Sequence, residues 1–276
     1  TQISKELLAY WQRSDRTRKL FFCQVEAAGT GIYLNEILLS GKKPRFKSAL
    51  EDMPEKNRLL SLAQSLDKLK DQPADDSLAA LVRLGLKMAT GSGKTVVMAM
   101  LIAWSFCNRA QVASDERFPD AVLAVCPNLT IKERLQVLRP EYPLNYYEAF
   151  DLVPTRLRPH LLRGKVMVTN WHLFAPESEH AEGGKTYTVV NKGAESPEAF
   201  ARRVLGDLYG RGKILVLNDE AHHAWRPSLT PSPSPGGGGV NPGIDKDEFQ
   251  EATVWINGLD TLQRAVGIRA CVDLSA

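Results

Sequence analysis

The stretch Met88-Ala89-Thr90-Gly91-Ser92-Gly93-Lys94-Thr95 joins a segment of strand character, residues 83–88, to a strongly apolar segment of helical character, residues 96–104. A glycine-rich turn at such a junction lets backbone N–H groups close around phosphate oxygens, and the helix N-terminus adds its positive dipole end. The pattern predicts a phosphate-binding loop. In such a loop Lys94 would reach the β- and γ-phosphates of a nucleotide, and the Thr95 hydroxyl would ligate Mg²⁺.

The loop departs from the usual motif at its first position, because the leading glycine of G-x-x-x-x-G-K-[ST] is replaced by Met88. A chance Gly/Ser/Lys turn before a helix is the alternative explanation. If the loop binds a nucleotide, we expect the phosphates to lie against Gly91, Ser92, Gly93, Lys94 and Thr95.

A second chemical centre follows the apolar run Lys213–Leu217, which predicts a buried strand that ends in Asn218-Asp219-Glu220-Ala221-His222-His223. Two adjacent carboxylates at a strand end form the other half of a nucleoside triphosphate site. Asp219 would hold Mg²⁺ and Glu220 would polarise the attacking water. A solvated Asp-Glu turn is the alternative, and the phosphate loop upstream argues against it. His222 would either relay the state of the γ-phosphate or simply cap and pack.

The composition is that of a globular protein, with 43% hydrophobic and 24% charged residues in a chain of 276. The net charge of +3 permits a nucleic-acid partner without arguing for one. The four cysteines are far apart, so free thiols in a reducing cytosol are expected and no metal site. The longest apolar run, around Val96 to Phe106, is too short to cross a bilayer. We therefore expect a cytoplasmic protein with no membrane partner.

Further apolar segments alternate between strand and helix character. Strands are expected at 121–126, 145–150, 165–170 and 270–274, and helices at 197–208 and 247–266. Thr130 is expected to cap a helix after the first of these strands, with Glu133 completing a capping box. The alternation predicts the α/β class, as a three-layer αβα sandwich with a mostly parallel sheet.

Residues 1–80 are expected to form a helical, accessory segment in front of the main domain, residues 81–276. Residues 1–20 predict an amphipathic helix whose arginines form a solvated face. A second helix is expected over 21–38, where Gln24 follows two aromatic residues. Its amide matches the N6 and N7 edge of adenine, and an exposed helix glutamine is the alternative.

Three stretches are expected to lie outside the sheet. Residues 41–80 are expected to be an insertion that contains a helix over 50–69 and a linker. Residues 175–196 are polar, and residues 227–243 carry Ser-Pro repeats and four consecutive glycines, so both are expected to be surface loops. The start lacks an initiator Met and the end stops as a strand finishes, which suggests a piece of a longer chain.

Five stretches resemble, in the right order, the motifs of the first RecA-like domain of a superfamily 2 helicase or translocase. Residues 88–95 resemble motif I, residues 126–135 motif Ia, and residues 166–174 motif Ib. Asp219–His222 reads D-E-A-H, as motif II does in DEAH-box members, and Ser275-Ala276 resembles the start of motif III. The combination of M-A-T-G-S-G-K-T, T-N-W-H and D-E-A-H-H most resembles the motor (Res) subunit of type III restriction enzymes.

This resemblance implies ATP and Mg²⁺ as cofactors and ATP hydrolysis coupled to movement along DNA. It implies that Lys94, Asp219 and Glu220 carry the chemistry, that Gln24 reads adenine, and that His222 and Ser275 couple the ATP site to motion. It places a further group against nucleic-acid phosphates, namely Asn128, Thr130, Lys132, Thr169 and Asn170.

The resemblance also implies partners. We expect DNA, double-stranded in the first instance, a second RecA-like domain that supplies an arginine finger, and a separate modification or recognition subunit. Without that second domain the chain is expected to turn ATP over poorly. A type I restriction motor and a stand-alone DNA or RNA helicase are alternatives within the same enzyme class. A non-hydrolysing nucleic-acid-binding scaffold is the alternative from another class.

Overall fold

In the computed structural model the chain folds around a six-stranded sheet with the order β1-β2-β6-β5-β3-β4. The structure describes residues 1–38, 68–73, 76–175, 195–226 and 246–276. The strands are β1 (Lys70–Asp71), β2 (Leu81–Lys87), β3 (Ala121–Cys126), β4 (Lys165–Asn170), β5 (Ile214–Asp219) and β6 (Ile268–Ser275). β1 runs antiparallel to β2, and the other neighbouring pairs are parallel. The expected α/β class with a mostly parallel sheet is confirmed.

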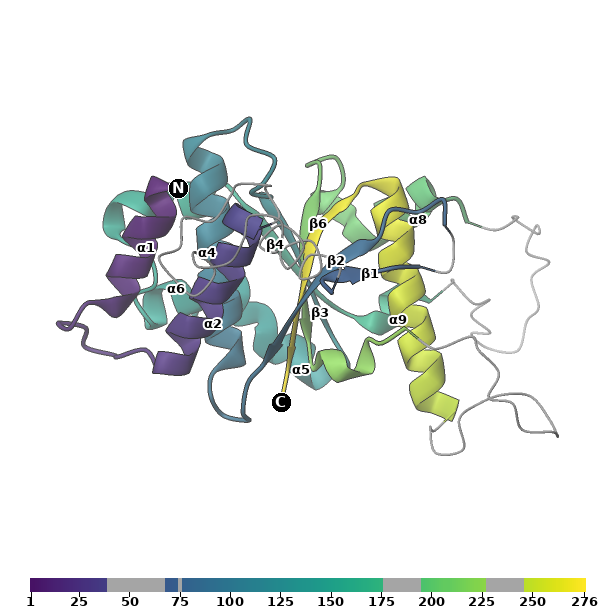
Figure 1. Ribbon diagram of the computed structural model, residues 1–276, viewed down its shortest axis with the longest axis horizontal. Coiled ribbons are helices and arrows are strands. Elements are labelled where there is room, and N and C mark those ends of the chain that lie inside the picture. The colour runs from purple at the N-terminus through teal and green to yellow at the C-terminus, as the bar shows by residue number, and fades with distance from the viewer. Residues whose placement is uncertain (39–67, 74–75, 176–194, 227–245) are drawn as a thin grey trace, which may run out of the picture.

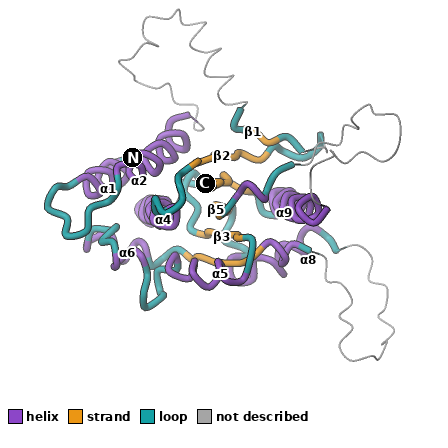
Figure 2. Tube along the Cα trace, turned by 90° about the horizontal axis from the view of Figure 1, so that it is seen from below, coloured by secondary structure: helices purple, strands orange, loops and turns teal. Residues whose placement is uncertain are grey.

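Helices cover both faces of the sheet, as Figures 1 and 2 show. They are α1 (Gln2–Gln12), α2 (Phe22–Tyr33), α4 (Lys94–Gln111), α5 (Leu129–Arg134), α6 (Tyr146–Ala149), α7 (Arg158–Leu161), α8 (Pro197–Leu205) and α9 (Lys246–Ala265). In Figure 1 α1, α2, α4 and α6 lie to the left of the sheet, and α8 and α9 to its right. Short turns of other helix types are η1 (Leu34–Leu38), η2 (Leu135–Leu138), η3 (Thr155–Leu157), η4 (Trp171–Phe174), η5 (Gly206–Leu208) and η6 (Ala221–His223).

The period of two along each strand sorts its side chains between two hydrophobic cores. In β5, Leu215 and Leu217 belong to the core with α4, whereas Ile214 and Val216 belong to the core with α8 and α9. All six residues of β5 are buried. A strand buried on both faces shows no polar alternation, which is why a continuous apolar run predicted it.

One expected strand, 145–150, is wrong, because those residues contain the helical turn α6. Asn145 precedes this turn as its cap, and its side-chain oxygen accepts a hydrogen bond from the backbone N–H of Glu148 (3.0 Å). That local bond satisfies a backbone donor that a strand would offer to a neighbour.

The expected capping role of Thr130 is also wrong. The cap of α5 is Asn128, whose Oδ1 accepts a hydrogen bond from the N–H of Ile131 at 2.9 Å. Asparagine is as good a cap as threonine, and it stands directly after the strand end. The expected helix 197–208 ends as α8 at Leu205, where Gly206 takes a positive φ of 46° and a short 3-10 turn follows.

The expectation that residues 41–80 lie outside the sheet is wrong for β1, which extends the sheet beyond β2. The expected helix over 50–69 falls almost entirely on residues outside the described part, as do the expected loops 175–196 and 227–243. The division at residue 80 remains a prediction. α1 and α2 nevertheless share one core with α4, through Leu7, Trp11 and Ile32.

The expected solvated face is wrong for Arg16, although Arg18 is exposed and Arg13 is half-buried. Arg16 is 6% exposed, and its guanidinium donates hydrogen bonds to the carbonyls of Tyr10, Phe150 and Asp151. The indole N–H of Trp11 donates to the carbonyl of Leu152 at 2.8 Å. These bonds fasten the α1–α2 loop to a turn that lies more than a hundred residues further along the chain.

Two helical glycines test how tightly this fold is packed. A Cβ on Gly258, in α9, would lie 2.4 Å from Cγ of Phe174, whereas a Cβ on Gly29, in α2, meets only Leu8 at an ordinary 3.7 Å. We expect Gly258→Ala to lower the free energy of unfolding by about 1–3 kcal/mol, because Phe174 must move. We expect Gly29→Ala to raise it by about 0.5–1 kcal/mol, because alanine favours the helix. Urea unfolding of both variants checks this, and a stabilised Gly258→Ala protein would contradict it.

Candidate nucleotide-binding site

The two predicted chemical centres meet at one edge of the sheet. β2 and β5 are separated only by β6, and the three strands are parallel, so their carboxyl ends share this edge. The phosphate loop follows β2, and Asp219 ends β5. The ammonium of Lys94 lies 3.2 Å from a carboxylate oxygen of Glu220. Open parallel sheets bind ligands at this edge, so the geometry agrees with the sequence prediction.

The phosphate loop takes its shape from two glycines with left-handed backbones. Gly91 has φ of 77° and Gly93 has φ of 86°, a region that costs other residues about 1 kcal/mol or more. Between them, the N–H and hydroxyl of Ser92 both donate to the carbonyl of Ala89, at 3.1 and 2.6 Å. Gly93 caps the long buried helix α4, which begins at Lys94.

Met88, which replaces the usual first glycine, belongs to the hydrophobic core and is 6% exposed. Its backbone N–H donates to the carbonyl of Ser275 at 2.9 Å. The replacement therefore anchors the start of the loop by an apolar side chain, and a backbone bond joins that start to the end of β6.

Gln24 fastens α2 to the phosphate loop. Its Nε2 donates to the carbonyl of Ser92 (2.9 Å), and its Oε1 accepts from the N–H of Phe21 (2.9 Å). Gln24 is 4% exposed, so the alternative of an exposed helix glutamine is wrong. The amide nitrogen keeps one further N–H donor and the amide oxygen one further lone pair, so contact with a base is compatible with these two bonds. The role in reading adenine stays a prediction.

Asp219 carries an electrostatic cost in this setting. Burial raises the pKa of its carboxyl above the ordinary value, and the neighbouring charge of Glu220 raises it further, whereas Lys94 lowers it. Asp219 is 8% exposed and lies on the α4 side of the sheet, where the period of two continues from Leu215 and Leu217. A desolvated carboxylate with a second carboxylate beside it is a good ligand for a divalent cation.

Glu220 holds an unusual backbone conformation. Its φ of 50° and ψ of 47° are left-handed, which is uncommon for a residue with a Cβ, and they turn the chain from β5 into η6. The turn points the side chain back at Lys94, and the second carboxylate oxygen lies 3.5 Å from Nδ1 of His222. His223 instead lies 3.5 Å from Glu251 of α9. The two adjacent histidines thus face different partners.

Thr95 and Asp219 are the residues that would hold Mg²⁺. Thr95 lies half-buried in the first turn of α4, one residue after Lys94. A hydroxyl and one carboxylate are hard oxygen ligands, which suits Mg²⁺, since this ion usually takes few protein ligands and completes its shell with water and phosphate. The donor set therefore fits the predicted cation.

The residues expected to face nucleic acid lie at the same edge, at the ends of β3 and β4. Asn128 and Thr130 are exposed, and Lys132 and Asn170 are half-buried. Thr169 is only 2% exposed, so the expectation that its side chain contacts a phosphate does not match its position. Its hydroxyl instead donates to the carbonyl of Asn170 (3.4 Å), and its own carbonyl accepts from the thiol of Cys126 in the neighbouring strand β3 (3.2 Å).

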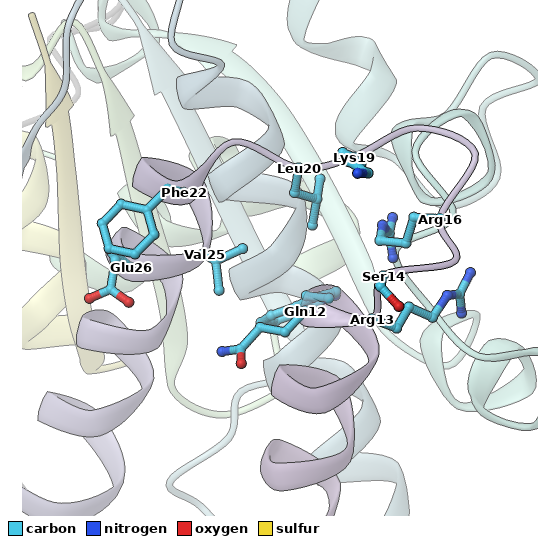
Figure 3. Close-up of a pocket in the computed structure, with 10 residues that line it drawn as sticks. Gln12, Arg13, Ser14, Arg16, Lys19, Leu20, Phe22, Val25 and Glu26 are labelled. Carbon is cyan, nitrogen blue, oxygen red and sulfur yellow. The ribbon is translucent and has the colours of Figure 1, made fainter.

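A cavity of about 430 Å³ opens between the end of α1, the following loop and the start of α2 (Figure 3). Gln12, Arg13, Lys19, Phe22 and Glu26 are among the residues that line it. No residue of the phosphate loop lines it, so it is separate from the site formed by Lys94 and Glu220. The sequence contained no signal for this cavity, because it depends on how Arg16 folds the loop back.

Comparison with known protein families gives a match over more than half of the chain. The model of the family described as "Type III restriction enzyme, res subunit" matches residues 60–231, which include the phosphate loop and the Asp-Glu-Ala-His sequence. No curated protein and no solved structure matches the chain significantly. Within the described part of the chain, no helix combines the length and apolarity that a membrane crossing requires.

Replacing Asp219 tests the electrostatic cost of the site. We expect Asp219→Asn to stabilise the nucleotide-free protein by about 1 kcal/mol at neutral pH while it removes the metal ligand. Because the pKa of Asp219 is raised in the folded state, the folded protein loses stability as the pH rises through that pKa and the carboxyl ionises. The asparagine variant stays neutral and does not lose this stability. The gain in melting temperature should therefore shrink toward zero as the pH is lowered. A less stable variant at neutral pH would contradict this.

The two loop glycines form a matched pair that isolates the contact with Gln24. Both Gly91→Ala and Gly93→Ala place a side chain at positive φ, but only the Cβ at Gly93 would meet Nε2 of Gln24, at 2.2 Å. We expect Gly93→Ala to cost roughly 1 kcal/mol more in unfolding free energy, because Gln24 must give up its bond to Ser92. Urea unfolding without nucleotide measures the difference, and equal losses for the two variants would refute it.

Proposed function

Because the chain belongs to the family of type III restriction enzyme res subunits, which carries a helicase-like ATPase motor, we propose that it is the ATP-binding half of a DNA-dependent translocase in a restriction or phage-defence system. The observation that carries the proposal is the meeting of Lys94 with Glu220 beside Asp219, at the shared edge of parallel strands. A solvated Asp-Glu turn would not bring a carboxylate to the lysine of a phosphate loop.

Lys94 and the loop would bind the phosphates of ATP. Backbone N–H groups of the loop and the N-terminus of α4, which begins at Lys94, would favour an anion there. The γ-phosphate would take the place of the Glu220 carboxylate at the Lys94 ammonium, since one cation now balances that carboxylate. Glu220 would then be released to polarise the attacking water.

Asp219 and Thr95 would hold Mg²⁺, which supplies charge neutralisation on the phosphate oxygens. Asp219 keeps its carboxylate close to Glu220 and Lys94, so release of Glu220 from Lys94 changes the charge around both residues. His222 lies close enough to Glu220 to sense this change, which supports a coupling role.

DNA would bind across the ends of β3 and β4, where Asn128, Thr130, Lys132 and Asn170 are accessible. Contacts of this kind go to phosphates, so they would give affinity and salt dependence but not sequence choice. A second RecA-like domain would close the ATP site with an arginine, and a separate modification subunit would recognise the sequence.

ATP hydrolysis by the intact protein tests the proposal. We expect double-stranded DNA to stimulate turnover, and Lys94→Ala to abolish it because the phosphates lose their cation. Rates should be measured without nucleic acid and with single-stranded DNA, double-stranded DNA or RNA. Stimulation by single strands or RNA alone would instead indicate a conventional helicase. Nucleotide binding without turnover under every condition would contradict the proposal and favour a scaffold.

A further inference from the structure

A chain of polar side chains crosses the sheet on the face opposite Asp219. Arg83 of β2, Asp273 of β6 and Asn218 of β5 lie on three neighbouring strands. The period of two places them on the side of Leu81, Val216 and Cys271, which belong to the core with α8 and α9. We call these three residues the cross-strand chain.

Each link of the cross-strand chain is a directed hydrogen bond. Nε of Arg83 donates to Oδ2 of Asp273 (2.7 Å), and Nδ2 of Asn218 donates to Oδ1 of the same carboxylate (2.6 Å). The indole N–H of Trp255, in α9, donates to Oδ1 of Asn218 at 3.2 Å. An indole can only donate, so Trp255 fixes which way the Asn218 amide faces.

Arg83 extends the cross-strand chain at its other end. Its Nη2 donates to the carbonyl of Ala224 (2.5 Å), in the segment that follows the two histidines, and its Nη1 donates to Oδ2 of Asp71 (3.1 Å). Burial lowers the pKa of Arg83, but the charge and hydrogen bond of Asp273 outweigh it and raise the pKa overall. The guanidinium therefore keeps its charge in this buried setting.

The cross-strand chain is built into the strands that carry the nucleotide site. Asn218 directly precedes Asp219, and Asp273 stands two residues before Ser275 in β6. Lys87 of β2 pairs with Ser275, whose carbonyl accepts the N–H of Met88 at the start of the phosphate loop. A shift of one strand against another would thus move Asp219 relative to the phosphate loop.

The setting makes a purely space-filling role a poor explanation. Asn218 is fully buried, and the side chains of Arg83 and Asp273 are only 16% and 14% exposed. Apolar residues at such positions usually give equal or greater stability, whereas hydrogen bonds are directional and fix one arrangement. Directional hydrogen bonds between the side chains of β2, β6 and β5 would fix the register of these strands, which is a reason to retain polar groups here.

We propose that Arg83, Asp273 and Asn218 are positioning residues for ATP hydrolysis, and that their hydrogen bonds hold the ends of β2, β6 and β5 in the register that aligns Asp219 and Glu220 with the phosphate loop. This inference rests on the proposed ATPase function. None of the three residues touches the reacting atoms, because they lie on the other face of the sheet from Asp219 and Lys94.

An exchange of two side chains tests the inference. In Asn218→Asp, two carboxylates face each other where an amide now meets a carboxylate. In Asp273→Asn, the new amide can accept from Arg83 only if its oxygen faces Arg83. Its NH₂ group then faces the NH₂ group of Asn218, whose orientation Trp255 fixes, so two donors meet. The double variant Asn218→Asp/Asp273→Asn restores every hydrogen bond of the cross-strand chain and moves its negative charge from position 273 to position 218. The carboxylate introduced at position 218 would accept from Trp255 and from the amide introduced at position 273, and the oxygen of that amide would accept from Arg83.

The readouts are kcat, KM for ATP and the number of nucleotide sites per chain, measured on the intact protein with its stimulating nucleic acid. We expect each single variant to lower kcat about tenfold, the effect of one weakened buried hydrogen bond, and to change KM less than about threefold. We expect the double variant to recover kcat to within about threefold of the unmodified protein.

Val204→Ala, which alters a fully buried residue of α8 in the same core, is the control for a merely structural effect. It should lower the melting temperature while kcat per nucleotide site stays unchanged. Three results would each overturn the inference. The first is an unchanged kcat in both single variants, and the second is a loss of kcat no greater than that of Val204→Ala at equal melting temperature. The third is an inactive double variant. Equal turnover by Lys94→Ala and the unmodified protein would instead overturn the proposed function.

Discussion

The parallel run of β2, β6 and β5 is the constraint on which the site depends. Their carboxyl ends share one edge, so the phosphate loop and Asp219 meet although more than a hundred residues separate them in the chain. The alternation of side chains then separates two tasks. Residues that face α4 carry the charges of the nucleotide site, and residues that face α9 form the hydrogen bonds of the cross-strand chain.

The candidate site contains unfavourable interactions. Glu220 keeps a left-handed backbone, and Asp219 is desolvated beside another carboxylate, with Lys94 as the compensating cation. Strain of this kind persists only where the surroundings enforce it. The long buried helix α4, which lies in one hydrophobic core, and the buried strand β5, which contributes side chains to both cores, provide that support. Under the proposed function, phosphate and a divalent cation would compensate these unfavourable interactions.

The sequence predicted the elements with strong periodic or continuous apolar patterns, such as β3 and β5, and it located the two motifs that follow β2 and end β5. It failed where a short polar contact decides the outcome. Asn145 closes a helical turn inside an expected strand, and Asn128 caps α5 in place of Thr130. β1 has only two residues, too few to show a period. The burial of Gln24 against Ser92 depends on tertiary contact, and no local pattern reveals it.

The helices α1 and α2 lie before residue 60, where the family match begins, yet Leu7, Trp11 and Ile32 share a core with α4. The region that matches the family is therefore not the same as the region that shares this hydrophobic core. During synthesis α1 and α2 leave the ribosome well before α4, and their apolar faces have no partner until the phosphate loop and its helix have emerged. For that interval the nascent chain exposes apolar surface of the kind that chaperones recognise, so α1 and α2, although translated before α4, reach their native packing only together with it.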